Sequence, residues 1–303
     1  MNDTSMSLEL PDGRQMGYAV FGDPAGAPCF VVHGFASSRW AAGWMLPPEL
    51  LHRHGVRIIA VDRPNYGLSS PHPAGGFRHW AEDACVLADH LDLNRVAVLG
   101  VSMGAGPALA LSATRRDLVT STTILSGMPP VGAREKWAPA SRGDALYWRL
   151  ARRAPWLLQR LCALSASMMA RQSADDAETL VSRVARALPE GDRAVFRSLL
   201  DSESSRAAYL ADVRESSSQG GAATAGDLQQ YLRPWGFDPA DIDGPITLWH
   251  GSDDPKVPVA LARRFADSLP RCTARFVPGG HFAPFEHGDE ILRDVSDGAR
   301  ATG

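Results

Sequence analysis

The chain has 303 residues, of which 45% are hydrophobic, and it carries a formal net charge of −3. This length is enough to bury one large core, and the near-neutral charge, with no basic patch, argues against a nucleic-acid partner. The first residues, MNDTSMSLEL, lack the basic and apolar regions of a signal peptide, and no apolar run is long enough for membrane insertion.

Four cysteines lie far apart in the sequence and show no metal-ligand spacing: Cys29, Cys85, Cys162 and Cys272. We expect them to be buried free thiols. Free thiols are typical of a reducing compartment, so the sequence favours a cytoplasmic protein.

The first part of the sequence alternates between strand-like and helix-like segments. A hairpin is predicted around Pro11-Asp12-Gly13, because apolar and polar residues alternate on both sides of that turn. Four short apolar runs resemble strands that are buried on both faces. The predicted strands cover 27–34, 56–62, 95–100 and 119–127, and the predicted helices cover 39–54, 77–93 and 105–116. This order indicates a mostly parallel sheet.

The alternation stops after residue 129, and no convincing strand follows until about residue 235. Helical patterns there cover 142–152, 156–170, 174–188, 191–200 and 203–218. Strands are then predicted at 245–251 and 272–280, and helices at 258–270 and 290–300. An independent helical domain is the alternative, but both ends of the stretch return to one sheet.

We therefore predict an α/β fold whose mostly parallel central sheet is flanked by helices and carries an inserted all-helical cap. The core covers 1–130 and 236–303, and the cap covers 131–235. Within the cap, residues 216–226 (SSSQGGAATAG) are rich in serine and glycine, so they are predicted to be a flexible hinge of a mobile lid.

Residues 100–104, GVSMG, match the pattern G-x-S-x-G between a predicted strand and a predicted helix. In this turn a serine sits on a sharp bend, and the glycines avoid collisions between a Cβ atom and neighbouring backbone. Ser102 would then expose its hydroxyl above a helix N-terminus, which suits an anionic tetrahedral intermediate. A glycine-flanked turn serine without catalytic function is the alternative.

A serine nucleophile needs a base, and the base needs an acid that orients it. The loop after the strand at 245–251 contains Asp253 and Asp254, and the loop after the last strand contains His281. Both loops fall at the carboxyl ends of strands, where α/β sheets place their chemistry. The order serine, acid, histidine favours a catalytic triad.

Two backbone N–H groups are needed to stabilise the oxyanion. Met103 follows the serine and supplies one. Phe35 follows His33-Gly34 after the first parallel strand and is predicted to supply the other. We expect His33 itself to be a structural residue.

These motifs resemble the α/β-hydrolase superfamily in its cap-bearing serine hydrolase and esterase branch. The similar segments are His33-Gly34, DRPNYGLS at 62–69, GVSMG, HGSDDPKVP at 250–258 and GGH at 279–281. The resemblance covers the core and leaves the cap without a specific signature. In this family the acid stands in a G-x-x-D-x-x-V-P pattern, which implies Asp254. Dehalogenase and epoxide-hydrolase mechanisms need a carboxylate where this chain has serine.

We therefore expect a serine hydrolase that cleaves a carboxylic ester or lactone in an apolar, small-to-medium molecule through an acyl-enzyme. No metal or organic cofactor is expected. The same triad could instead serve thioester cleavage, acyl transfer or cyclisation, or cofactor-free haloperoxidase chemistry, and the fold could also serve a non-catalytic receptor of small molecules. The sequence leaves open whether the chain forms a homo-oligomer.

Overall fold

The computed structural model describes residues 3–132, 139, 141–173 and 176–300. Eight strands form one sheet in the order β1-β2-β4-β3-β5-β6-β7-β8. Their bounds are β1 (Asp3–Glu9), β2 (Gln15–Gly22), β3 (Ala27–Val32), β4 (Val56–Val61), β5 (Val96–Val101), β6 (Val119–Leu125), β7 (Ile246–Gly251) and β8 (Cys272–Val277). The predicted hairpin is the antiparallel pair of β1 and β2, and β3 to β8 are parallel to one another. The predicted mostly parallel α/β sheet is therefore confirmed.

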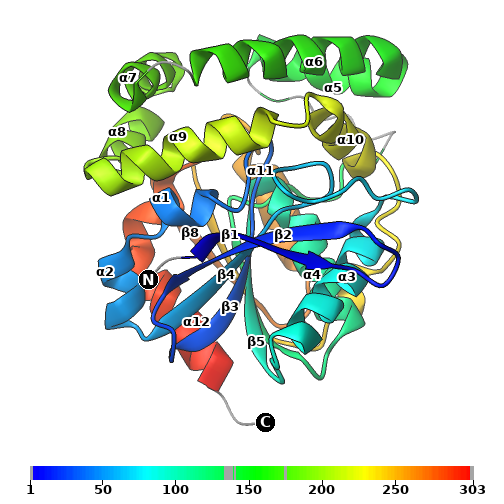
Figure 1. Cartoon of the computed structure of the whole chain (residues 1–303), viewed down its shortest axis with the longest axis vertical. Coiled ribbons are helices and arrows are strands. Elements are labelled where there is room, and N and C mark those ends of the chain that lie inside the picture. The colour runs from blue at the N-terminus through cyan, green and yellow to red at the C-terminus, as the bar shows by residue number, and fades with distance from the viewer. Residues whose placement is uncertain (1–2, 133–138, 140, 174–175, 301–303) are drawn as a thin grey trace.

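Helices cover both faces of the sheet (Figure 1). One layer contains α1 (Ala41–Met45), α2 (Pro48–Arg53) and α12 (Gly288–Arg300). The other contains α3 (Phe77–His90), α4 (Ala105–Thr114) and α11 (Val259–Ser268). Because both faces are covered, the inner strands read as continuous apolar runs, and every residue of β5 is buried.

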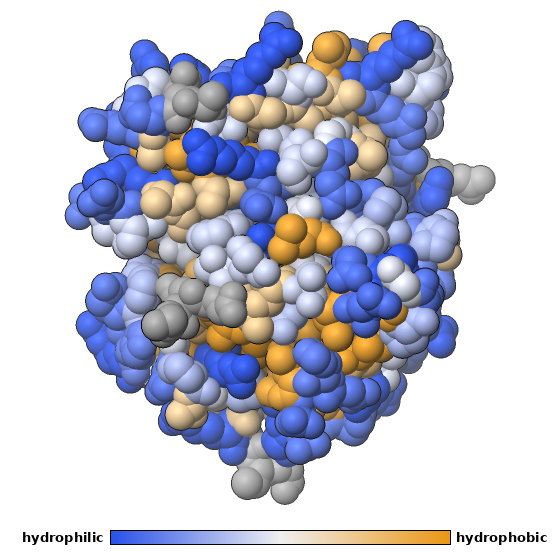
Figure 2. All heavy atoms as spheres, viewed as in Figure 1, coloured by the Kyte–Doolittle hydropathy of each residue, from blue (hydrophilic) through white to orange (hydrophobic). Residues whose placement is uncertain are grey.

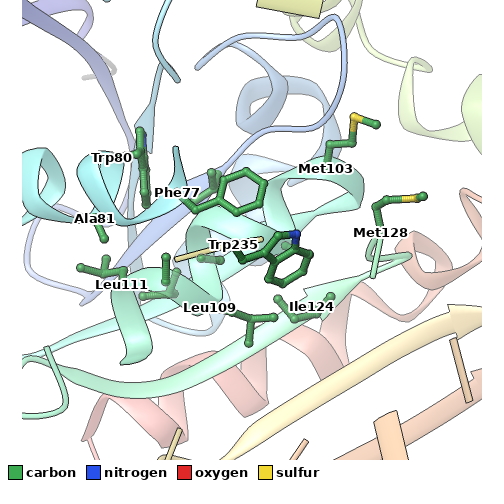
Figure 3. Packing of buried hydrophobic residues seen from close by; sticks show 14 of the residues in the cluster. Phe77, Trp80, Ala81, Met103, Leu109, Leu111, Ile124, Met128 and Trp235 are labelled. Carbon is green, nitrogen blue, oxygen red and sulfur yellow. The ribbon is translucent and has the colours of Figure 1, made fainter. Parts of the chain in front are cut away.

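The α3–α4 layer packs its aromatic side chains under residues 100–104, which carry Ser102 and are called the serine turn. Figure 3 shows Trp235 against Phe77, with Met103 and Met128 nearby, and the two aromatic ring centroids are 5.3 Å apart. Trp235 belongs to the segment that returns from the inserted helices to β7. This packing joins the insertion to the core beneath the carboxyl ends of the strands.

In the described residues between β6 and β7, six α-helices sit above the carboxyl edge of the sheet (Figure 1). They are α5 (Arg142–Arg153), α6 (Pro155–Gln172), α7 (Ala177–Ala187), α8 (Glu190–Leu199), α9 (Glu203–Ser217) and α10 (Ala222–Tyr231). We call them the inserted helices. The five helical patterns in the sequence correspond to α5–α9, while α10 was not predicted.

The candidate hinge at residues 216–226 is largely helical in the structure, and two contacts hold it to neighbouring segments. The Gln219 side chain donates to the carbonyl groups of Gly67 and Ser69, at 2.8 Å each. Gly221 packs so tightly that a Cβ atom there would lie 2.2 Å from the carbonyl carbon of Cys162. Glycine here permits close packing and does not provide flexibility.

Polar residues cover much of the face in Figure 2, with apolar areas among them. In the described part of the chain, no helix is long and apolar enough to cross a membrane. The four cysteines are free thiols, as expected, although only Cys29 and Cys162 are fully buried while Cys85 and Cys272 are half-buried.

A buried ion pair supports the loop after β3. Arg39 donates to the Asp62 carboxylate from its backbone N–H and from Nη1, both at 2.7 Å, and both side chains are at most 1% exposed. Nη1 of Arg39 also contacts Glu215 of α9 at 3.0 Å. Losing one partner of such a pair leaves a buried charge without compensation.

We predict that Arg39→Met lowers the free energy of unfolding by about 3–5 kcal/mol, because Asp62 stays buried without its counter-charge. Urea denaturation would measure the loss. Arg53→Met is the matched control, since Arg53 pairs with Asp289 at a site where the side chains are 61% and 50% exposed. The control should cost less than about 1 kcal/mol. Equal losses in both variants would contradict the prediction.

Candidate active site

The strand β5 ends in a strained turn that carries Ser102. The turn is a short 3₁₀ segment, Ser102–Gly104, that leads directly into α4, and Ser102 has a φ angle of +52°. This left-handed conformation is costly for a residue with a side chain and persists only where packing enforces it. The predicted strand–turn–helix context of Ser102 is thus present.

Both glycines of the turn lie where a side chain does not fit. A Cβ atom on Gly104 would lie 2.1 Å from the carbonyl oxygen of Val32, and one on Gly100 would lie 2.7 Å from the carbonyl oxygen of Gly104. The turn therefore packs directly against the end of β3. This close approach brings Gly34 beside Ser102, since a Cβ atom on Gly34 would lie 3.9 Å from the serine hydroxyl oxygen.

Ser102 lines a cavity of about 300 Å³ between the core and the inserted helices. The cavity wall is mostly apolar, with Asp144 and Lys256 as its charged members. The lining residues are Phe35, Ser102, Met103, Met128, Pro139, Asp144, Tyr147, Trp148, Leu228, Lys256 and Val257.

The loop after β8 carries His281, and the loop after β7 carries Asp254. Nδ1 of His281 hydrogen-bonds Oδ2 of Asp254 at 2.7 Å, and both residues are buried. Asp253 is exposed and instead contacts the backbone N–H of Gly279, at 3.3 Å. Of the two aspartates in this loop, the structure therefore brings Asp254 to the histidine.

The loop after β6 connects the serine turn to the histidine loop. The N–H of Met128 donates to the carbonyl of Ser102 at 3.0 Å, and the Ser126 hydroxyl donates to the carbonyl of His281 at 2.7 Å. Within the described residues, the Ser102 hydroxyl and the His281 ring share no hydrogen bond. Such contacts often form or tighten only when a substrate binds.

Asp254 is held in its ionised form. Burial raises the pKa of its carboxyl, but His281 and the backbone N–H of Val257 lower it by more, so the pKa lies below its usual range. The second oxygen accepts from the N–H groups of Lys256 and Val257 at 2.8 and 3.0 Å. An ionised Asp254 fixes Nδ1–H of His281 as the donor, which leaves Nε2 free to accept a proton.

Two other histidines in this region are structural, as the sequence suggested for His33. Burial and the Arg63 charge hold the pKa of His33 well below its usual value. Its Nε2 accepts from the backbone N–H of Arg63 at 3.1 Å, so Nδ1 donates to the carbonyl of Gly34 at 2.9 Å. His250 is fully buried, and its Nε2 contacts the carbonyl of Val257 at 2.8 Å.

Phe35 and Met103, the two expected N–H donors, both line the cavity beside Ser102. The guanidinium of Arg63 fixes the loop before Phe35, donating to the carbonyl groups of His33 and Gly34 at 3.1 and 2.6 Å. The arrangement can present two donors to an oxygen atom above Ser102.

Sequence reasoning missed several residues that hold these loops in place. Asp192 of α8 accepts from the N–H of Phe282, next to His281, at 2.8 Å. Asp212 of α9 accepts from the N–H and hydroxyl of Ser38 at 2.6 and 2.8 Å. Both are buried carboxylates. A carboxylate beside apolar positions of its own helix, such as Asp192 beside Val195 and Phe196, was the available signal, and it is weak.

Among the described residues, no group of three or more histidine, cysteine, aspartate or glutamate side chains is arranged to hold a metal ion.

A family model described as the alpha/beta hydrolase fold matches residues 28–288. An uncharacterized hydrolase of Bacillus subtilis (strain 168), YcgS, is 25% identical over 242 residues, which cover 79% of this chain and 82% of that protein. A non-heme chloroperoxidase of Streptomyces lividans is 29% identical over 135 residues, so the match spans 44% of this chain and about half, 48%, of that relative. The solved structure of an esterase, RhEst1, from Rhodococcus sp. ECU1013 superposes with a TM-score of 0.66 at 20% identity, covering 99% of this chain and 100% of the esterase.

We predict that the free energy of unfolding of Asp254→Asn falls less steeply at acid pH than that of the wild-type protein. A carboxyl whose pKa is lowered by folding stabilises the protein above its unfolded pKa of about 3.9, and this contribution is lost as the pH falls through the folded pKa. Between about pH 5 and pH 3, the wild-type protein should therefore lose stability faster than Asp254→Asn. Urea denaturation at each pH would measure this.

Asp253→Asn is the matched control, because it removes the neighbouring carboxylate, which is exposed and contacts neither His250 nor His281. Its stability curve should run parallel to that of the wild type. Parallel curves for wild type and Asp254→Asn would show that Asp254 is not held ionised by the fold.

Proposed function

This chain belongs to the α/β-hydrolase fold family, and on that premise we propose that it is a serine hydrolase that cleaves carboxylic esters or lactones. The observation that carries the proposal is a strained serine in an apolar cavity together with a buried aspartate–histidine pair, whose two loops are joined to the serine turn through the loop after β6. Ser102 sits there on a strained turn, and the buried Asp254 carboxylate hydrogen-bonds His281 at 2.7 Å. A non-catalytic receptor of the same fold is the alternative, and slow or single turnover with tight ligand retention would favour it.

In the proposed reaction, Ser102 attacks the substrate carbonyl while His281 takes its proton. Asp254 keeps the imidazole in the productive tautomer and stabilises the imidazolium. The backbone N–H groups of Phe35 and Met103 stabilise the oxyanion. His281 then protonates the leaving group, and a water molecule activated by the same histidine hydrolyses the acyl-enzyme. The carboxylate, imidazole and two amides suffice for this chemistry.

We propose that residues 131–235 act as a cap that selects the substrate. The proposal is supported by the cavity wall, to which the core contributes Phe35 and Met103 and the inserted helices contribute Tyr147, Trp148 and Leu228. A cavity of about 300 Å³ with a mostly apolar wall suits a small-to-medium apolar acyl or alcohol group. The free cysteines support the proposal of a cytoplasmic location.

Halogenation is a second candidate activity, because one relative is named a non-heme chloroperoxidase. A substrate panel separates it from ester hydrolysis. The panel contains p-nitrophenyl esters, lactones, thioesters and amides, and a separate arm tests halogenation with peroxide and halide. Acyl transfer and cyclisation would appear as products in which an added or internal nucleophile replaces water.

We predict that Ser102→Ala lowers ester turnover by roughly four to six orders of magnitude while the fold is retained. A fluorophosphonate should label the tryptic peptide that contains Ser102 in the wild-type protein and no peptide in the variant. Ser252→Ala is the control, because Ser252 is exposed in the loop that carries Asp254. Turnover by Ser102→Ala at the wild-type rate, or labelling of another serine, would overturn the proposed mechanism.

Tyr147 is predicted to limit the length of the acyl chain. It lines both the cavity at Ser102 and a neighbouring cavity of about 70 Å³, and its hydroxyl bonds that of Ser165 at 2.7 Å. Tyr147→Ala would join the two spaces. The ratio of kcat/KM for an octanoyl ester to that for an acetyl ester should rise about tenfold or more, because methylene groups gain apolar contacts.

Tyr147→Phe is the control for this variant. It removes the hydrogen bond to Ser165 but keeps the ring between the two cavities, so the ratio should stay near that of the wild type. An unchanged ratio in Tyr147→Ala would mean that the acyl chain occupies another part of the cavity.

A further inference from the structure

Helix α10 carries two polar side chains that reach into the core beside Ser102. Asp227 and Tyr231 are four residues apart, so they lie on the same face of the helix. Their side chains are buried, Asp227 at 9% exposure and Tyr231 at 0%. In Figure 1, α10 lies with α9 at the base of the inserted helices, next to the sheet. The ester hydrolysis proposed above assigns neither residue a role.

Asp227 is the counter-charge of a buried arginine. Its two carboxylate oxygens accept from Nη1 and Nη2 of Arg63 at 2.5 and 2.8 Å, in a bidentate pair. Arg63 is 4% exposed, and within the described residues it bonds no other carboxylate. Removing Asp227 would leave this guanidinium buried without compensation, so Arg63 would have to move.

A movement of Arg63 would be transmitted to the peptide that offers the Phe35 N–H. Nη2 of Arg63 donates at once to Asp227 and, at 2.6 Å, to the carbonyl of Gly34, which shares a peptide unit with that N–H. Asp227 also accepts from the hydroxyl of Tyr66 at 2.8 Å, and the same hydroxyl contacts the N–H of Ala36 at 3.4 Å. Both sides of Phe35 are thereby connected to one carboxylate.

Tyr231 bonds the peptide unit that directly follows the Met103 N–H, while the peptide of that N–H itself includes the Ser102 carbonyl. The Tyr231 hydroxyl donates to the carbonyl of Met103 at 2.8 Å and accepts from the N–H of Gly106 at 3.0 Å. These bonds bracket the first turn of α4, directly after Ser102. One helix face therefore contacts, through Arg63 or directly, both backbone segments that carry the proposed oxyanion donors, Phe35 and Met103.

We propose that helix α10 is a positioning element of the oxyanion hole, in which Asp227 sets the Phe35 amide through Arg63 and Tyr66, and Tyr231 sets the Met103 amide. The proposal rests on the proposed function of Ser102 as the nucleophile. Asp227 and Tyr231 are positioning residues and touch no reacting atom. The proposal has a consequence for the cap. Helix α10 must stay in contact with the core during catalysis, so any opening of the cap that admits substrate involves the other inserted helices.

A small displacement of an oxyanion donor should have a large effect on the rate. Removing a single oxyanion donor typically lowers kcat by 10²–10³-fold, because the donor acts on charge that develops only in the transition state. Displacing a donor that remains present should cost less, roughly 10-fold to 100-fold. Ground-state binding in the apolar cavity should change little, so KM should stay within about threefold.

The test compares a p-nitrophenyl ester with its thionoester, in which sulfur replaces the carbonyl oxygen. The thiolate-like sulfur of the intermediate accepts hydrogen bonds weakly, so a formed oxyanion hole favours the oxygen ester. We expect Asp227→Asn and Tyr231→Phe each to lower kcat for the oxygen ester by roughly 10-fold to 100-fold and to shrink the oxygen-to-sulfur ratio of kcat/KM by a similar factor. A general loss of folded protein would lower both rates equally and leave the ratio unchanged.

Two control variants test whether losing a tyrosine hydroxyl or a carboxylate elsewhere in the inserted helices also changes the ratio. Tyr209→Phe removes a hydroxyl from a buried tyrosine of α9 that packs on Trp44 and Phe196, and Asp176→Asn removes an exposed carboxylate at the start of α7. Neither should change the ratio. Where Asp227→Asn does not fold, Tyr231→Phe still decides the question, because it deletes only one oxygen atom.

The possible failures are distinguishable. If the wild-type protein does not hydrolyse the ester, or Ser102→Ala hydrolyses it equally well, the proposed function is overturned and this inference with it. If hydrolysis depends on Ser102 and the wild type prefers the oxygen ester, but Tyr231→Phe and any folded Asp227→Asn keep the wild-type ratio, the positioning role of α10 is overturned while the proposed function stands.

Discussion

The contact between the serine turn and the end of β3 is the constraint on which the rest of the site depends. The backbone of Gly104 lies so close to the carbonyl of Val32 that no side chain fits between them. This approach holds Ser102 in its left-handed conformation and brings Gly34 beside it. The amides of Phe35 and Met103 consequently come from two different loops yet line one cavity. The glycines that permit this approach are therefore required by packing as much as by the bend.

Buried carboxylates on the inserted helices hold the loops around that contact. Asp192, Asp212 and Asp227 come from three different helices, and each accepts hydrogen bonds from a different loop at the carboxyl edge of the sheet. A carboxylate is expensive to bury unless donors surround it, and a buried backbone N–H is expensive to leave unpaired. Helix and loop thus satisfy each other's hydrogen-bonding needs. The inserted helices are for this reason part of the site's framework as well as its cover.

The inserted helices differ in how firmly they are held to the core. Asp212 and Asp227 join α9 and α10 to the core through buried, multiply bonded carboxylates, which are costly to separate. At the cavity mouth, Asp144 of α5 faces Lys256 across 3.6 Å, with side chains 38% and 46% exposed. An exposed pair of this kind contributes little. The polar contacts therefore hold α9 and α10 to the core more firmly than the Asp144–Lys256 pair holds α5, whose Trp148 packs in the hydrophobic core.

The fold class, the position of the serine turn and the loops that carry Asp254 and His281 could be predicted from the sequence. Those features follow from local patterns: apolar runs with the length of buried strands, and glycines where only glycine fits. Contacts between distant segments appear only in the structure. It places the Asp254 carboxylate, which the family pattern implied as the acid, 2.7 Å from His281 and leaves Asp253 exposed. It also turns Asp227 and Tyr231 inward and anchors the glycine-rich stretch before them. Nothing in the local pattern distinguishes a carboxylate that meets a buried arginine from one that meets solvent, because the difference lies in which distant segment packs against the helix.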